Sequence, residues 1–281
     1  MTELRFNGAV YGCEPPETVL DALTRQDAAV PFFCRNGICL TCMMRSRAGT
    51  VPERSQKGLK DTLRLEGHFL PCICQPDQDL EIELPDDAAI FGRAVVRAVT
   101  PLAPNICRLT LDSATPLYYR AGQFVNLRCA DGLVRSYSLA SVPRLDDCLD
   151  IHVKRLPRGR MSNWIFDDLA PGDSLDVQGP NGECFYVPGR PETPLLLIGN
   201  GSGLAPLLGI ARDALASGHE SGIHLYHGSR HPDGLYLDAE LRAMDREHDN
   251  FTYHSCVSGE ELRDDDRPGR AEAVALGDHP D

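Results

Sequence analysis

Four cysteines have a spacing that can hold an iron–sulfur cluster. Cys34, Cys39 and Cys42 lie in the string FFCRNGICLTC, with four and then two residues between them, and Cys72 follows after 29 more residues. This is the plant-type spacing of a [2Fe-2S] site. Three thiolates on a short loop can reach a compact cluster from one side, and Gly37 lets the backbone pass close to inorganic sulfide. The spacing therefore predicts an electron-carrying centre whose fourth ligand comes from elsewhere in the fold.

Two other assignments of these cysteines compete. A zinc site usually pairs two C-x2-C knuckles, and the sequence has only one such pair, so the iron–sulfur interpretation is favoured. Cys74 could replace Cys72, because neighbours at i and i+2 of a strand share a face and geometry leaves the choice open. The remaining cysteines are expected to be buried or incidental thiols: Cys13, Cys107, Cys129, Cys148, Cys184 and Cys256.

The segments around the loop must form a small fold that positions the thiolates. The pattern predicts a hairpin that starts with residues 3–10, a helix over 18–26 and a closing strand over 79–84 with alternating apolar and acidic residues. The segment resembles the ferredoxin domains of bacterial oxygenase reductases, whose loop reads C-R-x-G-x-C-x-x-C. That resemblance implies a β-grasp fold of the α+β class and places the fourth ligand at the Cys of L-P-C, which is Cys72.

A second chemical motif lies in a segment of short strands. Residues 91–187 contain runs such as GRAVVRAVT, NICRLTLD, QFVNLRC and LDIHVKR, separated by Pro, Gly and Asp, which predicts an antiparallel barrel. Within it, Arg135-Ser136-Tyr137-Ser138 is similar to the R-x-Y-S flavin motif of the ferredoxin–NADP reductase superfamily. The resemblance implies that these four residues bind FAD: Arg135 pairs with the pyrophosphate, Tyr137 packs on the flavin ring and Ser138 lies near its reactive edge.

The next motif follows 24 residues later, at Gly159-Arg160-Met161-Ser162. These residues open a predicted helix, whose first N–H groups can receive a phosphate. The tetrapeptide corresponds to the superfamily's G-x-x-S pyrophosphate site, and Arg160 is well placed to touch phosphate. The FAD site is expected to take in three residues of the preceding strand as well: His152, Val153 and Lys154.

A glycine-rich turn predicts a nucleotide site. Residues 194–206 read as an apolar strand, the turn GNGSG and the start of a helix. Gly201 and Gly203 allow close approach to a phosphate, and Ser202 keeps the hydroxyl of the similar G-G-T-G-x-A-P loop. Asn200 replaces a glycine of that loop, which we expect to be tolerated because Asn adopts left-handed turns.

The residue after the next strand bears on the choice of dinucleotide. Arg230 stands where the adenosine ribose of the cofactor would lie. A second basic residue nearby would favour NADPH, but the neighbours are His231, Pro232 and Asp233, so the sequence favours NADH.

The resemblance has a gap at the end of the sequence. The superfamily closes this domain with a strand that carries a C-G-x-x-x-M-like motif, whereas Cys256 here is followed by Val-Ser-Gly and the last residues, GDHPD, are predicted to be a loop. We therefore expect either a truncated chain or an incomplete nucleotide sheet, with weaker nicotinamide binding.

These patterns predict a multidomain protein. Residues 1–88 would form a β-grasp ferredoxin domain, 89–190 an antiparallel β-barrel FAD domain, and 191–281 an α/β nucleotide-binding domain that lacks its last strand or strands.

Composition narrows the class of protein. The net charge of −13 disfavours a nucleic-acid partner, because a polyanion would be repelled. The sequence shows neither a signal peptide nor a long apolar run, which predicts a cytoplasmic protein with no membrane partner. Eleven cysteines in such a chain favour metal ligation over disulfides. The resemblance adds the expectation of a monomer.

The motifs together predict a relay in which NADH reduces FAD and the electrons leave singly through the [2Fe-2S] cluster. Tyr137, Ser138 and Ser202 are the residues expected beside the reacting groups. The domain order resembles the reductase components of aromatic-ring dioxygenases and of phenol, toluene or methane monooxygenases, so an oxygenase is the expected acceptor. Two alternatives stay open: a reductase for a deoxysugar-forming dehydratase, and a non-enzymatic redox carrier or sensor that cannot use NADH.

Overall fold

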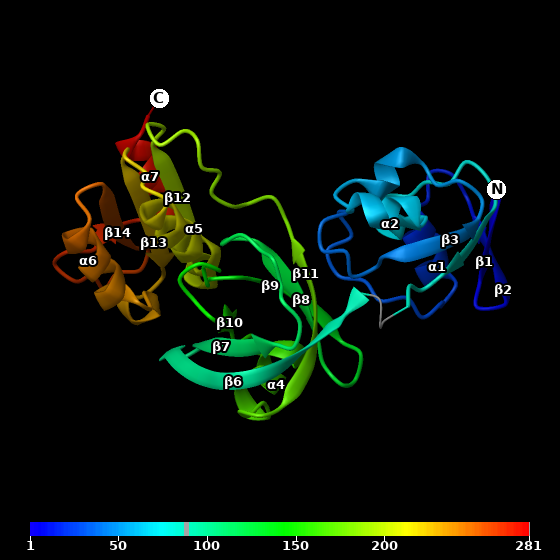
Figure 1. The fold of residues 1–281 in the computed structure, drawn as a ribbon, viewed down its shortest axis with the longest axis horizontal. Helices are drawn as coiled ribbons and strands as arrows, with labels where there is room; N and C mark the ends of the chain where they lie inside the picture. The colour runs from blue at the N-terminus through cyan, green and yellow to red at the C-terminus, as the bar shows by residue number, and fades with distance from the viewer. Residues whose placement is uncertain (87–89, 281) are drawn as a thin grey trace. The chain divides into compact units, whose positions relative to one another are not determined.

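The computed structural model describes residues 1–86 and 90–280 of the chain. Figure 1 shows its helices and strands, and its contacts divide the chain into two units. The first, here called the N-terminal unit, comprises Met1–Gly92, Asn126–Ser136 and Asp176–Gly182, and the rest is the C-terminal unit. The predicted domain boundary between residues 88 and 89 lies outside the described residues.

The N-terminal unit is built on a five-stranded sheet with the order β2-β1-β5-β3-β4. β1 and β2 form an antiparallel hairpin in which Phe6 pairs with Ala9, and β5 runs parallel to β1. The predicted hairpin, helix and closing strand are therefore confirmed. The strands are β1 (Thr2–Phe6), β2 (Ala9–Cys13), β3 (Met44–Ala48), β4 (His68–Phe69) and β5 (Leu80–Glu83). The helices are α1 (Val19–Arg25), η1 (Glu53–Gln56), α2 (Asp61–Leu65) and η2 (Pro71–Ile73).

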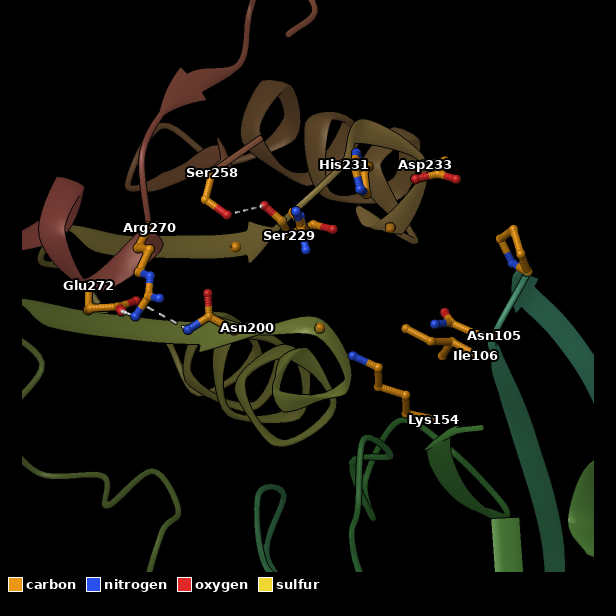
Figure 2. Close-up of a pocket in the computed structure, with 15 residues that line it drawn as sticks. Asn105, Ile106, Lys154, Asn200, Ser229, His231, Asp233, Ser258, Arg270 and Glu272 are labelled. Carbon is orange, nitrogen blue, oxygen red and sulfur yellow. Dashed lines mark hydrogen bonds and ion pairs between the residues drawn. The ribbon is translucent and has the colours of Figure 1, made fainter. Parts of the chain in front are cut away.

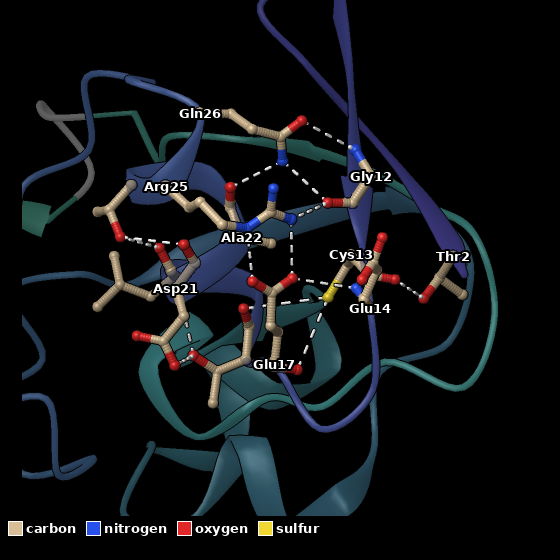
Figure 3. A network of polar contacts seen from close by, with 12 residues as sticks. Thr2, Gly12, Cys13, Glu14, Glu17, Asp21, Ala22, Arg25 and Gln26 are labelled. Atoms are coloured by element: carbon tan, nitrogen blue, oxygen red, sulfur yellow. Dashed lines mark hydrogen bonds and ion pairs between the residues drawn. The ribbon is translucent and has the colours of Figure 1, made fainter.

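Helix α1 is held by a cap, a buried face and a polar network. The Thr18 side chain accepts a hydrogen bond from the Asp21 N–H, which satisfies a donor of the first turn. Figure 3 shows the contacts at the other end: Arg25 pairs at 2.6 Å with Glu17, which lies between β2 and α1, and Gln26 ties the helix to the hairpin by donating to the Gly12 carbonyl at 2.8 Å. The buried face packs into the core of this unit through Val19, Leu20, Ala22 and Leu23.

The runs of the middle segment form one six-stranded sheet, here called the barrel sheet, with the order β10-β7-β6-β11-β8-β9. The β10–β7 and β7–β6 pairs are antiparallel, as the short alternating runs predict. The strands are β6 (Gly92–Ala103), β7 (Ile106–Ser113), β8 (Phe124–Arg128), β9 (Val134–Ser138), β10 (Leu149–Lys154) and β11 (Ser174–Asn181), with helix α4 (Arg160–Asp167) between β10 and β11.

The C-terminal segment is an α/β unit on a parallel sheet with the order β12-β13-β14-β15. The apolar run and the glycine turn become β12 (Leu195–Asn200), η3 (Gly201–Gly203) and α5 (Leu204–Ala216). The remaining elements are β13 (Ile223–Ser229), η4 (Pro232–Gly234), α6 (Asp238–Glu247), β14 (Phe251–Val257), β15 (Arg267–Pro268) and α7 (Ala271–Asp278). The prediction that GDHPD is a loop was wrong for Gly277 and Asp278, which belong to the last turn of α7.

Across residues 1–86 and 90–280, no helix combines the length and the apolar character needed to cross a membrane.

Candidate functional site

The cysteine loop is folded around its own sulfur atoms. The N–H groups of Asn36 and Cys39 point at Cys34 Sγ, both at 3.4 Å, and the Cys34 N–H points at Cys39 Sγ at 3.5 Å. Gly37 has φ +72°, which favours glycine, and a Cβ there would lie 2.7 Å from Ile73 Cδ1, so the Ile73 side chain would have to shift for any larger residue. N–H groups that point at sulfur stabilise thiolate, which is the form that binds iron.

The four predicted ligands come together as two thiol pairs. Cys34 shares a hydrogen bond with Cys39, and Cys42 shares one with Cys72. Cys42 lowers the pKa of Cys72 to about 7, while that hydrogen bond and burial raise the pKa of Cys42. Within the described residues, no three His, Cys, Asp or Glu side chains gather around a point that a single ion could fill. Two pairs of thiolates are the donor set that suits the two irons of a [2Fe-2S] cluster.

Cys72 and Cys74 have different surroundings. The assumption that both lie on a strand was wrong, because residues 71–73 form the 3-10 helix η2 and the two thiols therefore leave the backbone in different directions. Cys72 meets Cys42, whereas Cys74 is fully buried and hydrogen-bonds with Ser55. Burial raises the pKa of Cys74 to about 12, which keeps it a neutral core thiol.

Strand β9 carries the R-x-Y-S motif next to the cysteine loop. The Arg135 guanidinium lies 4.7 Å from the centre of the Phe33 ring and donates to the Val134 carbonyl at 2.7 Å. Ser136 donates to Asn126 Oδ1 at 2.6 Å, so its hydroxyl is directed at strand β8. Tyr137 and Ser138 are half-buried at the end of the strand. The motif thus lies in a strand that also contacts the loop before Cys34.

The second flavin motif begins helix α4, with Gly159 at the N-cap. The first intrahelical hydrogen bond runs from the Asn163 N–H to the Gly159 carbonyl at 2.9 Å, which leaves the N–H groups of residues 160–162 ahead of it at the positive end of the helix. Ser162 is buried and receives the Leu156 N–H at 3.1 Å, so its hydroxyl shapes the turn before the helix. Arg160 is exposed and Met161 is buried. This helix end suits a phosphate group.

The glycine-rich turn opens onto a cavity of about 530 Å³ (Figure 2). Gly201 has φ +53° and supplies the left-handed residue of the turn. Asn200 is extended, with φ −116°, so the expectation that it takes the left-handed position was wrong; its amide donates to Glu272 at 3.2 Å. Ser202 is half-buried and Gly203 is exposed in the same turn. The lining includes Lys154, Gly201, Ser229, Arg230, Asp233 and Arg270.

A buried aromatic cluster supports the turn from behind. His152 Nδ1 lies 3.0 Å from the Tyr236 hydroxyl, and His227 Nε2 lies 3.3 Å from the Gly201 carbonyl oxygen. The rings of both histidines meet the Tyr236 ring edge to face. Burial lowers the pKa of His152 to about 3 and that of His227 to about 4, so both are neutral near pH 7. The structure thus directs the His152 side chain at Tyr236, while the neighbouring Val153 is buried.

Sequence reasoning missed two residues of these sites. Arg270 lines the cavity beside the glycine turn together with Arg230, although 39 residues separate them, so the second basic residue is close in space but distant in sequence. Asn126 donates a hydrogen bond to the Cys39 carbonyl at 2.7 Å. An Asn inside a predicted strand carries no motif, so only the fold could reveal this contact.

Comparison with known families matches three successive segments of the chain. Residues 6–77 match the 2Fe-2S iron-sulfur cluster binding domain, residues 93–186 the oxidoreductase FAD-binding domain, and residues 197–281 the oxidoreductase NAD-binding domain. These matches agree with the β-grasp, β-barrel and α/β folds that the three motifs predict.

Curated relatives and solved structures give the same result. The chain is 36% identical over 268 residues to the reductase subunit of an aromatic O-demethylase of Amycolatopsis sp., covering 90% of this chain and 79% of the relative. It is 34% identical over 258 residues to the reductase component of a phenol 2-monooxygenase of Pseudomonas sp., covering 88% and 72%. The crystal structure of an Amycolatopsis cytochrome P450 reductase is similar with a TM-score of 0.67 and 33% identity, covering 100% of this chain and 87% of that one.

Proposed function

Because the chain belongs to the ferredoxin–NAD(P) reductase superfamily, we propose that it is the reductase component of an oxygenase system, which takes electrons from a nicotinamide cofactor and delivers them to an oxygenase component. The observation that carries this proposal is the likeness along 90% of the chain to such a reductase subunit, with all three cofactor modules present in one order. When bound, nicotinamide supplies a hydride, FAD divides the electron pair, and the cluster carries single electrons.

The residues around the glycine turn would hold the nicotinamide cofactor. Gly201 lines the cavity, Ser202 follows it in the turn, and the start of α5 favours negatively charged phosphate. Lys154 Nζ lies 3.5 Å from the position that a Cβ of Gly201 would take, which places a cation beside the turn. His227 holds the Gly201 carbonyl from the buried side, so the N–H groups of the turn can face the cavity.

The flavin contacts are proposed on two elements, strand β9 and the start of α4. In this proposal Arg135 and the helix end at Gly159 take the pyrophosphate, while Tyr137 and Ser138 lie beside the ring. The contact of Arg135 with Phe33 supports this arrangement, since Arg135 lies next to the loop that carries Cys34. The proposed ligands of the cluster are the two thiol pairs, Cys34 with Cys39 and Cys42 with Cys72.

We propose NADH as the physiological donor. Asp233 lines the cavity together with Arg230, and its carboxylate would repel a 2′-phosphate but could accept a hydrogen bond from a 2′-hydroxyl. The second arginine of the cavity, Arg270, lies 3.8 Å from the Glu272 carboxylate, which offsets part of its charge. Steady-state kcat/KM for NADH and NADPH tests this proposal, and a higher value for NADPH would contradict it.

We also propose a cytoplasmic location and a monomeric state. Four cluster thiols that must remain reduced suit the cytoplasm. A monomer would be seen as a single species of 30.8 kDa in sedimentation velocity.

The decisive experiment is an anaerobic titration of the purified holoprotein with NADH, followed by its visible spectrum. Bleaching of the flavin and then of the cluster is expected, and subsequent addition of an oxygenase component should reoxidise the cluster. If dithionite bleaches both centres but NADH bleaches neither, the protein is a carrier or sensor that cannot use NADH, and the reductase proposal fails.

A further inference from the structure

One buried amide connects the cysteine loop with the strand of the flavin motif. Asn126 in β8 is 1% exposed. Its Nδ2 donates to the Cys39 carbonyl oxygen at 2.7 Å and to Gln178 Oε1 at 2.5 Å, and its Oδ1 accepts from the Ser136 hydroxyl at 2.6 Å. Both amide hydrogens and one oxygen lone pair are therefore used, and the contacts reach three separate segments of the N-terminal unit.

The orientation of this amide follows from its partners. The Cys39 carbonyl can only accept a hydrogen bond, so the nitrogen of Asn126 must face the cysteine loop. Gln178 in β11 is itself fixed, because its Oε1 also accepts from Asn181 at 3.3 Å. A fully satisfied buried network of this kind holds its members rigidly, and the loss of one member leaves unpaired polar groups.

The carbonyl that Asn126 holds is next to a strained residue. Leu40 has φ +57°, a left-handed conformation that is unfavourable for a residue other than glycine. Such a strained conformation persists where the surroundings determine it. The hydrogen bond from Asn126 fixes the peptide group between Cys39 and Leu40, so it determines both the turn and the direction of the Cys39 side chain.

Ser136, the other partner, is placed between two residues of the flavin motif. Its neighbours Arg135 and Tyr137 are the proposed FAD contacts, and strand alternation turns their side chains to the opposite face. A short chain of contacts thus runs from the flavin strand through Ser136 and Asn126 to Cys39, a proposed ligand of the cluster.

We propose that Asn126 is a positioning residue for electron transfer, which fixes Cys39 relative to the flavin strand and so sets the rate at which the cluster is reduced. This inference rests on the proposed function. The step moves one electron from reduced flavin to the oxidised cluster, makes and breaks no bond between heavy atoms, and leaves Asn126 unchanged. Removing a residue that contacts a metal ligand without itself binding the metal typically changes metal affinity or activity about 10- to 100-fold.

The test compares Asn126→Leu with the matched variant Asn181→Leu, each as holoprotein. Asn181 belongs to the same network, but among the described residues its side chain donates to Gln178 and not to the cysteine loop. After anaerobic mixing with NADH, stopped-flow spectra should show flavin reduction at the wild-type rate in both variants, and cluster reduction about 10-fold slower in Asn126→Leu alone. Hydrogen exchange of peptides covering residues 34–42 should be faster in Asn126→Leu, a readout that does not depend on turnover.

Asn126→Asp keeps the shape and the acceptor for Ser136 but loses the N–H donors, so it separates loss of the hydrogen bond to Cys39 from loss of side-chain shape. It should also slow cluster reduction and speed exchange of the loop. Wild-type kinetics and exchange in both Asn126 variants, or equal effects in Asn181→Leu, would overturn the proposal. If NADH fails to reduce the wild-type flavin, the proposed function fails separately, and photochemical reduction of the flavin still tests Asn126.

Discussion

At the scale of single residues, the surroundings of two nearby cysteines predict opposite roles. Cys72 faces Cys42, whereas Cys74 is buried beside Ser55. Cys72→Ala should abolish the cluster because one iron loses a thiolate, while Cys74→Ala should retain it with a modest loss of stability. Iron and sulfide analysis with EPR of the reduced protein measures both. A cluster that survives Cys72→Ala but not Cys74→Ala would reverse the ligand assignment.

Two buried histidines predict how stability depends on pH. His152 and His227 have folded pKa values of about 3 and 4, below the value of 6.5 expected for the unfolded chain. The unfolded state therefore binds more protons as the pH falls below about 6.5, so stability present above this pH is progressively lost toward pH 3 to 4. Between pH 7 and pH 5, each histidine should lower the free energy of unfolding by about 2 kcal/mol.

His152→Gln tests that prediction. Its loss of unfolding free energy between pH 7 and pH 5 should be about 2 kcal/mol smaller than that of the wild type, since one of the buried titrating groups is gone. Urea unfolding followed by fluorescence of Trp164, the sole tryptophan, provides the measurement. The exposed His231→Gln serves as the control and should keep the wild-type dependence. Equal pH dependence in both variants would exclude His152 as a source.

At the scale of elements, helix α5 packs closely against a segment that follows β9. A Cβ on Gly209 would lie 3.0 Å from the Ala140 carbonyl oxygen and 3.3 Å from the Ala121 Cβ. Gly209→Val should therefore destabilise the protein by about 1–3 kcal/mol through overpacking. In contrast, Gly277 in α7 has open space around it, and Gly277→Ala should be neutral or stabilise by up to about 1 kcal/mol. Thermal unfolding measures the change in stability of each variant. A Gly209→Val variant as stable as the wild type would show that α5 can shift to make room.

At the scale of the whole molecule, one arginine ties the barrel sheet to the nucleotide segment inside the C-terminal unit. Arg144 donates to the carbonyls of Asp213 and Ala216 and to the Ser217 hydroxyl, and it pairs with the Asp213 carboxylate at 2.9 Å. A cation at the end of α5 is favoured by the helix dipole. The contact fixes the helix that begins at the glycine turn.

Arg144→Ala should loosen that attachment and slow reduction of the flavin by NADH severalfold, because a small misplacement of reacting groups is costly. Stopped-flow measurement at 450 nm, a wavelength where flavins absorb, follows the step. The matched control is Arg97→Ala, which removes an arginine that pairs with Asp112 at 2.6 Å and Asp147 at 2.9 Å, none of which belongs to the nucleotide segment. Equal rates in both variants would show that the Arg144 contact is only structural.

Local patterns in the sequence were sufficient for much of the fold. The hairpin, α1, the strands of the barrel sheet and the strand–turn–helix at residues 195–216 follow from alternation, capping and glycine turns, which act between residues close in sequence. The same is true of the C-x4-C-x2-C loop, because three ligands on one short loop must keep a fixed spacing. The family comparisons agree with the three cofactors that these motifs predict.

Contacts between distant residues decided the rest. The choice of Cys72 over Cys74 depends on the 3-10 turn at η2, which no propensity rule separates from a strand over three residues. Arg270 reaches the nucleotide cavity only because β15 and α7 bring it beside the ends of β12 and β13. Asn126 and Cys39 are 87 residues apart. The sequence by itself thus determined the cofactors and the elements that bind them, while the tertiary structure determined which side chains meet, because the burial and pairing of polar groups depend on the whole fold.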